Sequence, residues 1–432
     1  MHASDQVFAL VDVNNMYVSC ERAFNPKLRH RPVVVLSNND GCAVARSNEV
    51  KALGVKMGAP WFQMKDLVRE HGIIGLSSNY TLYGDMSNRM VSILRTYSPH
   101  VEVYSIDESF LGLDGMHGLW ESRTEMGQDI REQIQRCMAL PVCVGIGSSK
   151  TLAKLANHVA KKFALFGGVC DFTTMSAARQ DWLFRRINVG EVWGVGRRIG
   201  DRLHEMGIDT VQALKASEPR DMRAQFGVVM ERTCSELRGH SCLALEELAP
   251  ARKEIVSSRS FGQMVSTLDD LSEAVSMYVS RASEKLRGQG SVCGAIHVFV
   301  HTNRFRERDP QYCNGVTIPF PEPTDDLRTL AGAAICGLHK IYRTGFQYKK
   351  AGVMLMDISP NTFHQGALFN QERPRDATVK LMAVLDGLNK RFGRDALHLA
   401  SAGMGHRWAM RAENRTPRYT THWNELPTAH AN

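Results

Sequence analysis

The stretch FALVDVNNMYVSCE, residues 8–21, joins an apolar run to a polar turn and then to a second mixed segment. Residues 8–13 have the length and composition of a buried strand, although the run carries one acid, Asp12. Asn14 or Asn15 can then cap a helix that carries Tyr17. The strand-to-helix order therefore predicts a carboxylate at the end of a buried strand.

A second acidic strand end follows in VEVYSIDESFLGL, residues 101–113, which predicts a hairpin of strands over 101–107 and 109–113. Adjacent carboxylates repel each other unless a cation neutralises them, and Mg²⁺ prefers carboxylate oxygens together with substrate phosphates. Two metal ions about 4 Å apart support phosphoryl transfer. Asp12, Asp107 and Glu108 are thus candidate metal ligands. The alternative for the last two is a solvent-exposed turn pair.

The order of elements indicates an α/β or α+β sheet, because strands and helices alternate. Between 175 and 245 only helices and turns are expected, and 252–358 reads strand–helix–strand–strand–helix–strand, the ferredoxin-like order. In the first part, strands are expected over 7–13, 32–36, 101–107, 109–113 and 141–146, and helices over 47–53, 60–70, 80–97, 121–138 and 150–163. One more helix is expected near 375–391.

The composition is that of a globular protein, with 43% hydrophobic and 23% charged residues. The length of 432 residues suggests about two to four domains. No stretch approaches the ~20 apolar residues that cross a bilayer, and the first residues lack the pattern of a signal peptide. None of the ten cysteines forms a C-x-x-C pair, which argues against a zinc ribbon or disulfide framework. We expect a cytoplasmic protein without a membrane partner.

The net charge of +8 is unevenly distributed. Residues 1–145 carry a net charge of −2 and the remainder carries +10. Such asymmetry favours a polyanionic partner such as nucleic acid, with a merely basic soluble protein as the alternative. A nucleic-acid partner would make binding steeply dependent on salt.

The motifs quoted above resemble those of the Y-family translesion DNA polymerases. Residues 8–21 resemble their opening and residues 104–109, YSIDES, their catalytic S-I-D-E motif. Residues 32–42, PVVVLSNNDGC, narrow the resemblance to the UmuC branch, which includes the catalytic subunit of bacterial DNA polymerase V and plasmid-type homologues. The similarity extends to PRYTT, residues 417–421, and so covers essentially the whole chain.

The resemblance implies an α+β multidomain right-hand polymerase. A ferredoxin-like palm would comprise residues 1–30 and 80–175, and small fingers residues 31–79. A helical thumb would comprise residues 176–245, a βαββαβ little finger residues 252–358, and a C-terminal tail residues 359–432.

The resemblance also assigns the catalytic residues. Asp12, Asp107 and Glu108, with the backbone carbonyl of Val13, would hold two Mg²⁺ ions. Tyr17 would be the steric gate, a ring whose clash with a ribose 2′-hydroxyl selects deoxynucleotides. The alternative for Tyr17 is an aromatic residue of the helix core.

Two lysines are expected at the triphosphate. Lys161 matches a lysine that contacts the incoming nucleotide, with a solvated helix charge as the alternative. Asn48 and Lys51 stand where many Y-family enzymes have a Tyr and an Arg. Lys51 keeps the charge but lacks the bidentate guanidinium.

Two glycine-containing segments invite a phosphate-binding interpretation. Gly194, Gly196, Arg197 and Arg198 resemble a helix-hairpin-helix turn, whose backbone N–H groups contact duplex phosphates; a tight interhelical turn is the alternative. Residues 145–151, GIGSSKT, fail the P-loop pattern. Lys150 and Lys154 are instead expected to line a basic helix.

A short peptide in the tail is similar to the one with which bacterial polymerases bind the sliding clamp. Gln365, Leu368 and Phe369 form a Q-x-x-L-F pattern, in which the two apolar residues would be anchors. Chance or a local packing role is the alternative.

These features together predict an error-prone, template-directed DNA polymerase of the bacterial SOS response, without proofreading. Its substrates would be primer–template DNA and dNTP, and its partners the sliding clamp, a processed UmuD-type dimer and the RecA filament. The alternatives are a non-catalytic DNA-binding accessory subunit and a palm-type nucleotide cyclase.

Overall fold

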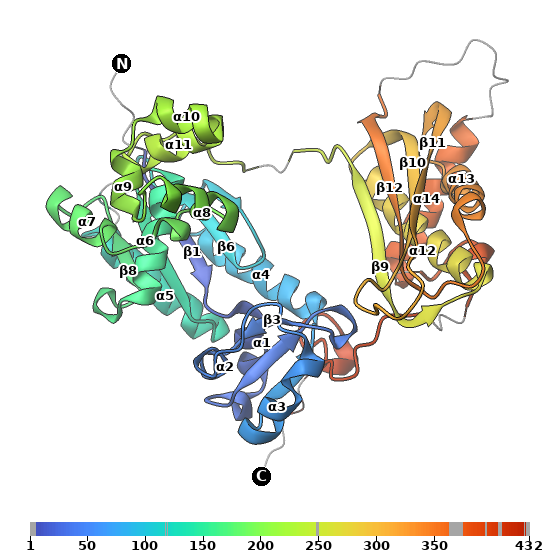
Figure 1. Ribbon diagram of the computed structural model, residues 1–432, viewed down its shortest axis with the longest axis horizontal. Coiled ribbons are helices and arrows are strands. Elements are labelled where there is room, and N and C mark those ends of the chain that lie inside the picture. The colour runs from blue at the N-terminus through green and yellow to red at the C-terminus, as the bar shows by residue number, and fades with distance from the viewer. Residues whose placement is uncertain are drawn as a thin grey trace. The chain divides into compact units, whose positions relative to one another are not determined.

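The computed structural model describes residues 6–116, 118, 120–247, 250–362, 375–393, 395–404, 408–426 and 428. The chain divides into two compact units (Figure 1). The first comprises residues 1–37, 41–249 and 414–432, and the second comprises residues 38–40 and 250–413.

A five-stranded sheet forms the centre of the first unit. Its order is β5-β6-β1-β7-β8, with β7 and β8 parallel and the other neighbours antiparallel. The strands are β1 (Phe8–Val13), β5 (Val101–Val103), β6 (Glu108–Gly112), β7 (Val142–Gly147) and β8 (Val169–Asp171). The first strand thus lies in the middle, which explains its continuous apolar run.

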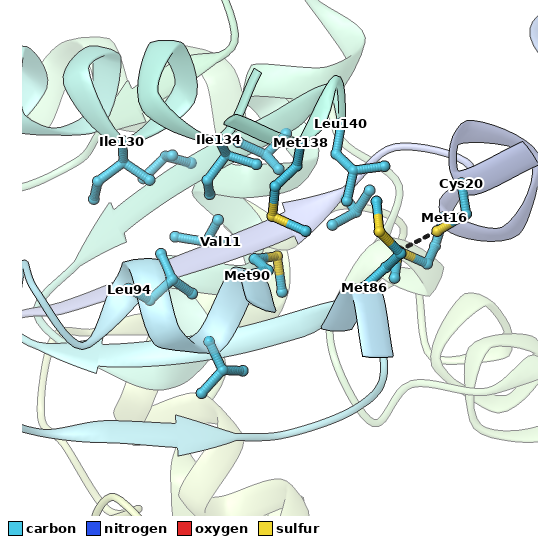
Figure 2. Packing of buried hydrophobic residues seen from close by; sticks show 14 of the residues in the cluster. Val11, Met16, Cys20, Met86, Met90, Leu94, Ile130, Ile134, Met138 and Leu140 are labelled. Atoms are coloured by element: carbon cyan, nitrogen blue, oxygen red, sulfur yellow. Dashed lines mark hydrogen bonds between the residues drawn. The ribbon is translucent and has the colours of Figure 1, made fainter. Parts of the chain in front are cut away.

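Alternate residues of β1 pack against helices on opposite faces of the sheet. Ala9, Val11 and Val13 join the core formed with α4 (Tyr80–Leu94) and α5 (Arg123–Met138). Figure 2 shows Val11 between Met90 and Leu94 of α4 and Ile130 and Ile134 of α5. The other face packs on α6 (Lys150–Lys162), where Phe8 and Leu10 cluster with Ala153.

The glycines of the sequence GIGSSKT have a packing role. A Cβ at Gly145 would lie 2.1 Å from the backbone nitrogen of Asn157 and 2.2 Å from the carbonyl oxygen of Ala153, so only glycine lets α6 approach β7 this closely. The Asn157 amide then donates to the carbonyls of Leu10 and Cys143, at 3.3 and 2.8 Å. Helix α6 is therefore held firmly against the two central strands.

A smaller three-stranded sheet lies in the segment between α1 (Met16–Phe24) and α4, with the order β3-β2-β4. Its elements are β2 (Val33–Leu36), β3 (Ala43–Arg46), α2 (Asn48–Ala52), α3 (Lys65–His71) and β4 (Ile74–Ser77). A helical segment follows β8, with α7 (Ala177–Phe184), α8 (Arg197–Glu205), α9 (Val211–Ala216), α10 (Pro219–Phe226) and α11 (Val228–Leu237). No helix in the described ranges is long and apolar enough to span a membrane.

The second unit has the predicted strand–helix–strand–strand–helix–strand order. Its antiparallel sheet has the order β11-β10-β12-β9 and forms one core with its helices. The elements are β9 (Ile255–Val265), α12 (Leu268–Gly288), β10 (Ser291–Thr302), β11 (Cys313–Thr324), α13 (Leu327–Ile341), β12 (Tyr348–Pro360) and α14 (Arg375–Phe392).

The strand predicted over 101–107 is wrong in its second half, because β5 ends at Val103. The backbone N–H groups of Tyr104 and Ser105 both donate to the carbonyl of Glu108, at 3.1 and 3.0 Å, and close a turn. The Ser105 hydroxyl accepts from the N–H groups of Asp107 and Glu108. Asp107 therefore lies in the turn, and Glu108 begins β6.

Candidate active site

The structure brings the three predicted acids to one end of the central sheet. Asp12 lies directly opposite Glu108 in the antiparallel register of β1 and β6. The next residue, Val13, donates its N–H to the carbonyl of Asp107 at 2.9 Å. Strand β1 is hydrogen-bonded to β6 on one side and to β7 on the other, and Asp12 is only 7% exposed.

Two lysines of α6 bind these carboxylates. Lys154 Nζ lies 2.8 and 2.7 Å from the two carboxylate oxygens of Glu108, and Lys161 Nζ lies 2.5 Å from Asp12 Oδ1. The two lysines are seven residues apart, about two helical turns, so they share one face of α6. Two clustered anions at this site are therefore neutralised by two cations.

Lys150 and Lys154, which were expected to line a basic helix, lie on α6 with acidic partners. Lys154 faces Glu108, and the Lys150 side chain is 5% exposed and bonded to Glu102. Both lysines lie on the side of α6 that packs on the sheet, and the sequence pattern of the helix does not distinguish a lysine that faces a buried acid from one that faces water.

Burial raises the pKa of the Asp12 carboxyl to about 7, although the Lys161 ammonium acts in the opposite direction. The neighbouring Glu108 carboxylate raises the same pKa further. The ionised form of this pair consequently needs a nearby cation.

The donor set suits Mg²⁺ chemically, since it consists of carboxylate oxygens from two adjacent strands and from the turn that precedes β6. Within the described ranges, no three or more His, Cys, Asp or Glu side chains converge into a ready-made metal cage. Their carboxylates have other partners: Glu108 is bonded to Lys154, and the Asp107 carboxylate accepts from the Ser105 hydroxyl. Mg²⁺ usually takes only one or two protein carboxylates and completes its shell with phosphates and water, so the residues fit.

Tyr17 lies on α1 with its ring held by two aromatic residues of α4. It stacks on Tyr83, with centroids 4.5 Å apart and planes at 14°, and meets Tyr80 edge-on at 5.8 Å. Burial raises the pKa of Tyr17, and the nearby Tyr80 and Asp107 contribute in the same direction. The ring is partly buried against the core of the first unit and lies within the electrostatic influence of Asp107.

A basic cluster lies beside the acids, and one of its members was not predicted from the sequence. Lys51 Nζ donates to Asn15 Oδ1 at 2.6 Å, and the Asn15 amide donates to Asn48 at 3.0 Å. Burial lowers the pKa of Lys51, and the positive charges of Arg46 and Lys161 act in the same direction. Arg46, at the end of β3 and two residues before α2, is the residue that sequence reasoning missed.

The glycine turn of the helical segment adopts a backbone that favours glycine. Gly194 has a φ of 87°, and Gly196 precedes α8 without a side-chain cap. Arg197 and Arg198 therefore begin a helix whose first N–H groups have no side-chain acceptor. The indole of Trp193 donates to the Tyr104 hydroxyl at 3.2 Å.

Gln365, Leu368 and Phe369 lie outside the described residues. The clamp-binding interpretation of this peptide therefore stays a prediction.

Family models match most of the folded chain. The impB/mucB/samB family matches residues 11–158, and the C-terminal domain of the same family matches residues 252–368. A domain of unknown function matches residues 379–429.

Similar proteins cover nearly the whole length. Protein UmuC of Salmonella typhimurium is 47% identical over 97% of this chain and 99% of its own. Protein MucB of Escherichia coli is 45% identical over 98% and 99%, and DNA polymerase IV of Moorella thermoacetica is 26% identical over 93% and 97%.

Solved structures share the fold. A chimeric Y-family DNA polymerase, Dbh-Dpo4-Dbh, matches with a TM-score of 0.65 and 20% identity, over 82% of this chain and 100% of its own. The insertion ternary complex of Dbh DNA polymerase matches with a TM-score of 0.52 and 19% identity, over 82% and 100%.

Proposed function

We infer the function from the family to which the chain belongs, the impB/mucB/samB family of UmuC-type Y-family proteins: it is a DNA polymerase that carries out error-prone translesion synthesis. Its fold is that of a right-hand polymerase with palm, fingers, thumb and little finger. The observation that carries the assignment is the sequence similarity to UmuC and MucB, which are 47% and 45% identical over nearly the whole chain. The acid pair Asp12 and Glu108 at one end of the sheet supports it. The accessory-subunit and cyclase alternatives have no observation in their favour.

As a nucleotidyltransferase of this family, the chain uses a divalent metal. We propose that two Mg²⁺ ions are held by Asp12, Asp107, Glu108 and the Val13 carbonyl. When bound, they would activate the primer 3′-hydroxyl and stabilise the charge that develops on the phosphate. Glu108 would lie nearest the 3′-hydroxyl, which attacks the α-phosphate and displaces pyrophosphate.

The lysines would change partners as substrate enters. Lys161 is 35% exposed at its side chain and contacts a single oxygen of Asp12, so its ammonium can turn to a triphosphate once Asp12 has another cation. Lys51 lies in the same electrostatic cluster and would bind the phosphates with it. The three positive charges of Lys51, Lys161 and Arg46 are opposite in sign to the triphosphate of an incoming dNTP and would attract it.

We propose Tyr17 as the steric gate. Replacing Tyr17 by Ala should raise the relative efficiency of ribonucleotide incorporation by about tenfold or more, because it removes the ring that would clash with the ribose 2′-hydroxyl. Each tenfold change corresponds to ~1.4 kcal/mol of lost discrimination. The measurement is kcat/KM for dNTP and rNTP opposite one template base. Tyr17→Phe keeps the ring and should keep the wild-type ratio. An unchanged ratio in Tyr17→Ala would remove the gate assignment.

The duplex would be held without sequence readout. Arg197 and Arg198 at the start of α8, with the N–H groups that follow Gly194 and Gly196, are suited to backbone phosphates. The basic residues of the second unit would add further backbone contacts.

The finer biological setting is also a proposal. We propose that Gln365, Leu368 and Phe369 bind the sliding clamp, and that a processed UmuD-type dimer and the RecA filament act with the enzyme at the nucleoid of the cytoplasm in the SOS response. No exonuclease-like segment is expected in the family, so synthesis would proceed without proofreading.

The decisive experiment is primer extension with Mg²⁺ on an undamaged and an abasic template, with and without UmuD-type and RecA partners. We expect extension past the abasic site in at least one of these conditions. Normal DNA binding with no extension in any of them would contradict the proposed function.

A further inference from the structure

The C-terminal segment Asn414–Leu426, here named the strap, folds back onto the first unit. Ser77 at the end of β4 donates its N–H to the carbonyl of Asn414 at 3.1 Å, and Asn414 donates to the Ser77 hydroxyl at 3.0 Å. Two further contacts continue along the strap: the Asn79 amide reaches Thr416 and Pro417, and Tyr419 stacks on Phe24 at 4.8 Å and 11°. The strap is thus fixed by both backbone and side-chain bonds.

A buried acid connects the strap to the interior. Glu21 on α1 is 1% exposed, and one of its carboxylate oxygens accepts from the Tyr83 hydroxyl at 2.6 Å and from the Thr416 hydroxyl at 3.1 Å. Burial raises the pKa of Glu21, whereas these two hydrogen bonds lower it. A buried carboxylate that depends on two neutral donors is sensitive to the loss of either one.

The other hydroxyl that donates to Glu21, that of Tyr83, belongs to a residue in direct contact with the proposed gate. Tyr83 is fully buried, and its ring is the face on which Tyr17 stacks. Its position is fixed at one end by helix α4 and at the other by the hydroxyl bond to Glu21. Thr416, Glu21, Tyr83 and Tyr17 consequently form one continuous series of contacts.

The strap also holds the start of the helix that supports the gate. Asn79 caps α4 by accepting from the N–H of Leu82, while its amide nitrogen donates to the Thr416 hydroxyl at 3.1 Å and to the carbonyls of Thr416 and Pro417. Tyr80 and Tyr83, both in the first turn of α4, are the two rings that contact Tyr17. Both supports of the gate therefore depend on the strap.

We propose that the strap is a positioning element for sugar discrimination, with Thr416 as its principal residue. A gate that rejects one hydroxyl by clash tolerates only small displacements, so a residue that fixes Tyr83 determines how sharply Tyr17 discriminates. The proposal rests on Tyr17 being the gate. It assigns a role to the last part of the segment that matches a domain of unknown function.

The test compares Thr416→Val, which keeps the shape but removes the hydroxyl, with Thr416→Ser, which keeps the donor. We expect Thr416→Val to lower the ratio of dNTP to rNTP kcat/KM by about threefold or more while dNTP kcat/KM changes by less than about twofold. Thr416→Ser should retain the wild-type ratio. Thr421→Val, on the exposed side of the same strap, is the matched control and should also retain it.

The same ratio in a Tyr17→Ala background separates this proposal from the gate assignment. There, Thr416→Val should have no further effect, because the ring that it positions is gone. If Tyr17→Ala alone leaves the ratio unchanged, the gate assignment fails and the proposal fails with it. If Tyr17→Ala changes the ratio but Thr416→Val does not, or if Thr416→Val lowers dNTP and rNTP efficiency equally, the strap is merely structural and the proposal alone is overturned.

Discussion

Replacing Asp107 by Asn is expected to lower primer extension by about a thousandfold or more while leaving DNA binding intact. Asn has the shape of Asp but no charge, so the turn that contains it should persist, including the acceptance of a hydrogen bond from Ser105. What is lost is one of three negative charges proposed to hold Mg²⁺. Because Asp12 and Glu108 remain and the fold should be unchanged, the variant tests whether the negative charge of Asp107 is required for activity.

The comparison needs a matched carboxylate outside the site. Glu132 lies exposed on α5, and Glu132→Gln removes one negative charge without touching the acids. We expect it to extend primers as the wild type does. Single-turnover extension and DNA affinity should be measured for both variants. Wild-type extension by Asp107→Asn would show that the two-metal assignment is wrong.

Replacing Lys150 by Met is expected to lower the free energy of unfolding by about 3–5 kcal/mol, because it leaves a buried carboxylate without its cation. Lys150 Nζ lies 2.8 and 2.7 Å from the two oxygens of Glu102, and the two side chains are 5% and 7% exposed. Glu102 also accepts from the N–H of Glu246 at 2.8 Å. The pair thus fastens the segment after α11 to the edge of the sheet.

Urea unfolding followed by circular dichroism should show the lower midpoint. Lys162→Met, an exposed substitution on the same helix, should leave the midpoint nearly unchanged. The double variant Lys150→Met/Glu102→Gln should recover part of the loss, because Gln carries no charge and still offers an oxygen to Glu246. A single variant as stable as the wild type would mean that water compensates Glu102 and that the pair is not effectively buried.

The helical face that carries Lys150 and Lys154 illustrates what sequence reasoning did not reveal. In a helix of mixed composition, a lysine next to small apolar residues is usually exposed. Here the acids that pair with these lysines come from β5 and β6, 48 and 46 residues away in the chain. No spacing within the helix encodes such partners, so the pairing could be seen only when the helix was placed on the sheet.

The sequence by itself predicted most helices and strands of both units, the carboxylates at two strand ends and the family resemblance, because periodicity, strand ends and motif spacing are local properties of the chain. It missed the short strands β3, β4 and β8. The tertiary structure decided what holds those carboxylates in place. It placed Lys154 and Lys161 on the acids, added Arg46 to the basic cluster, and brought Thr416 to Glu21 across 395 residues. Contacts of such separation depend on how the elements pack and on where the chain returns, and they leave no periodic signal in the sequence.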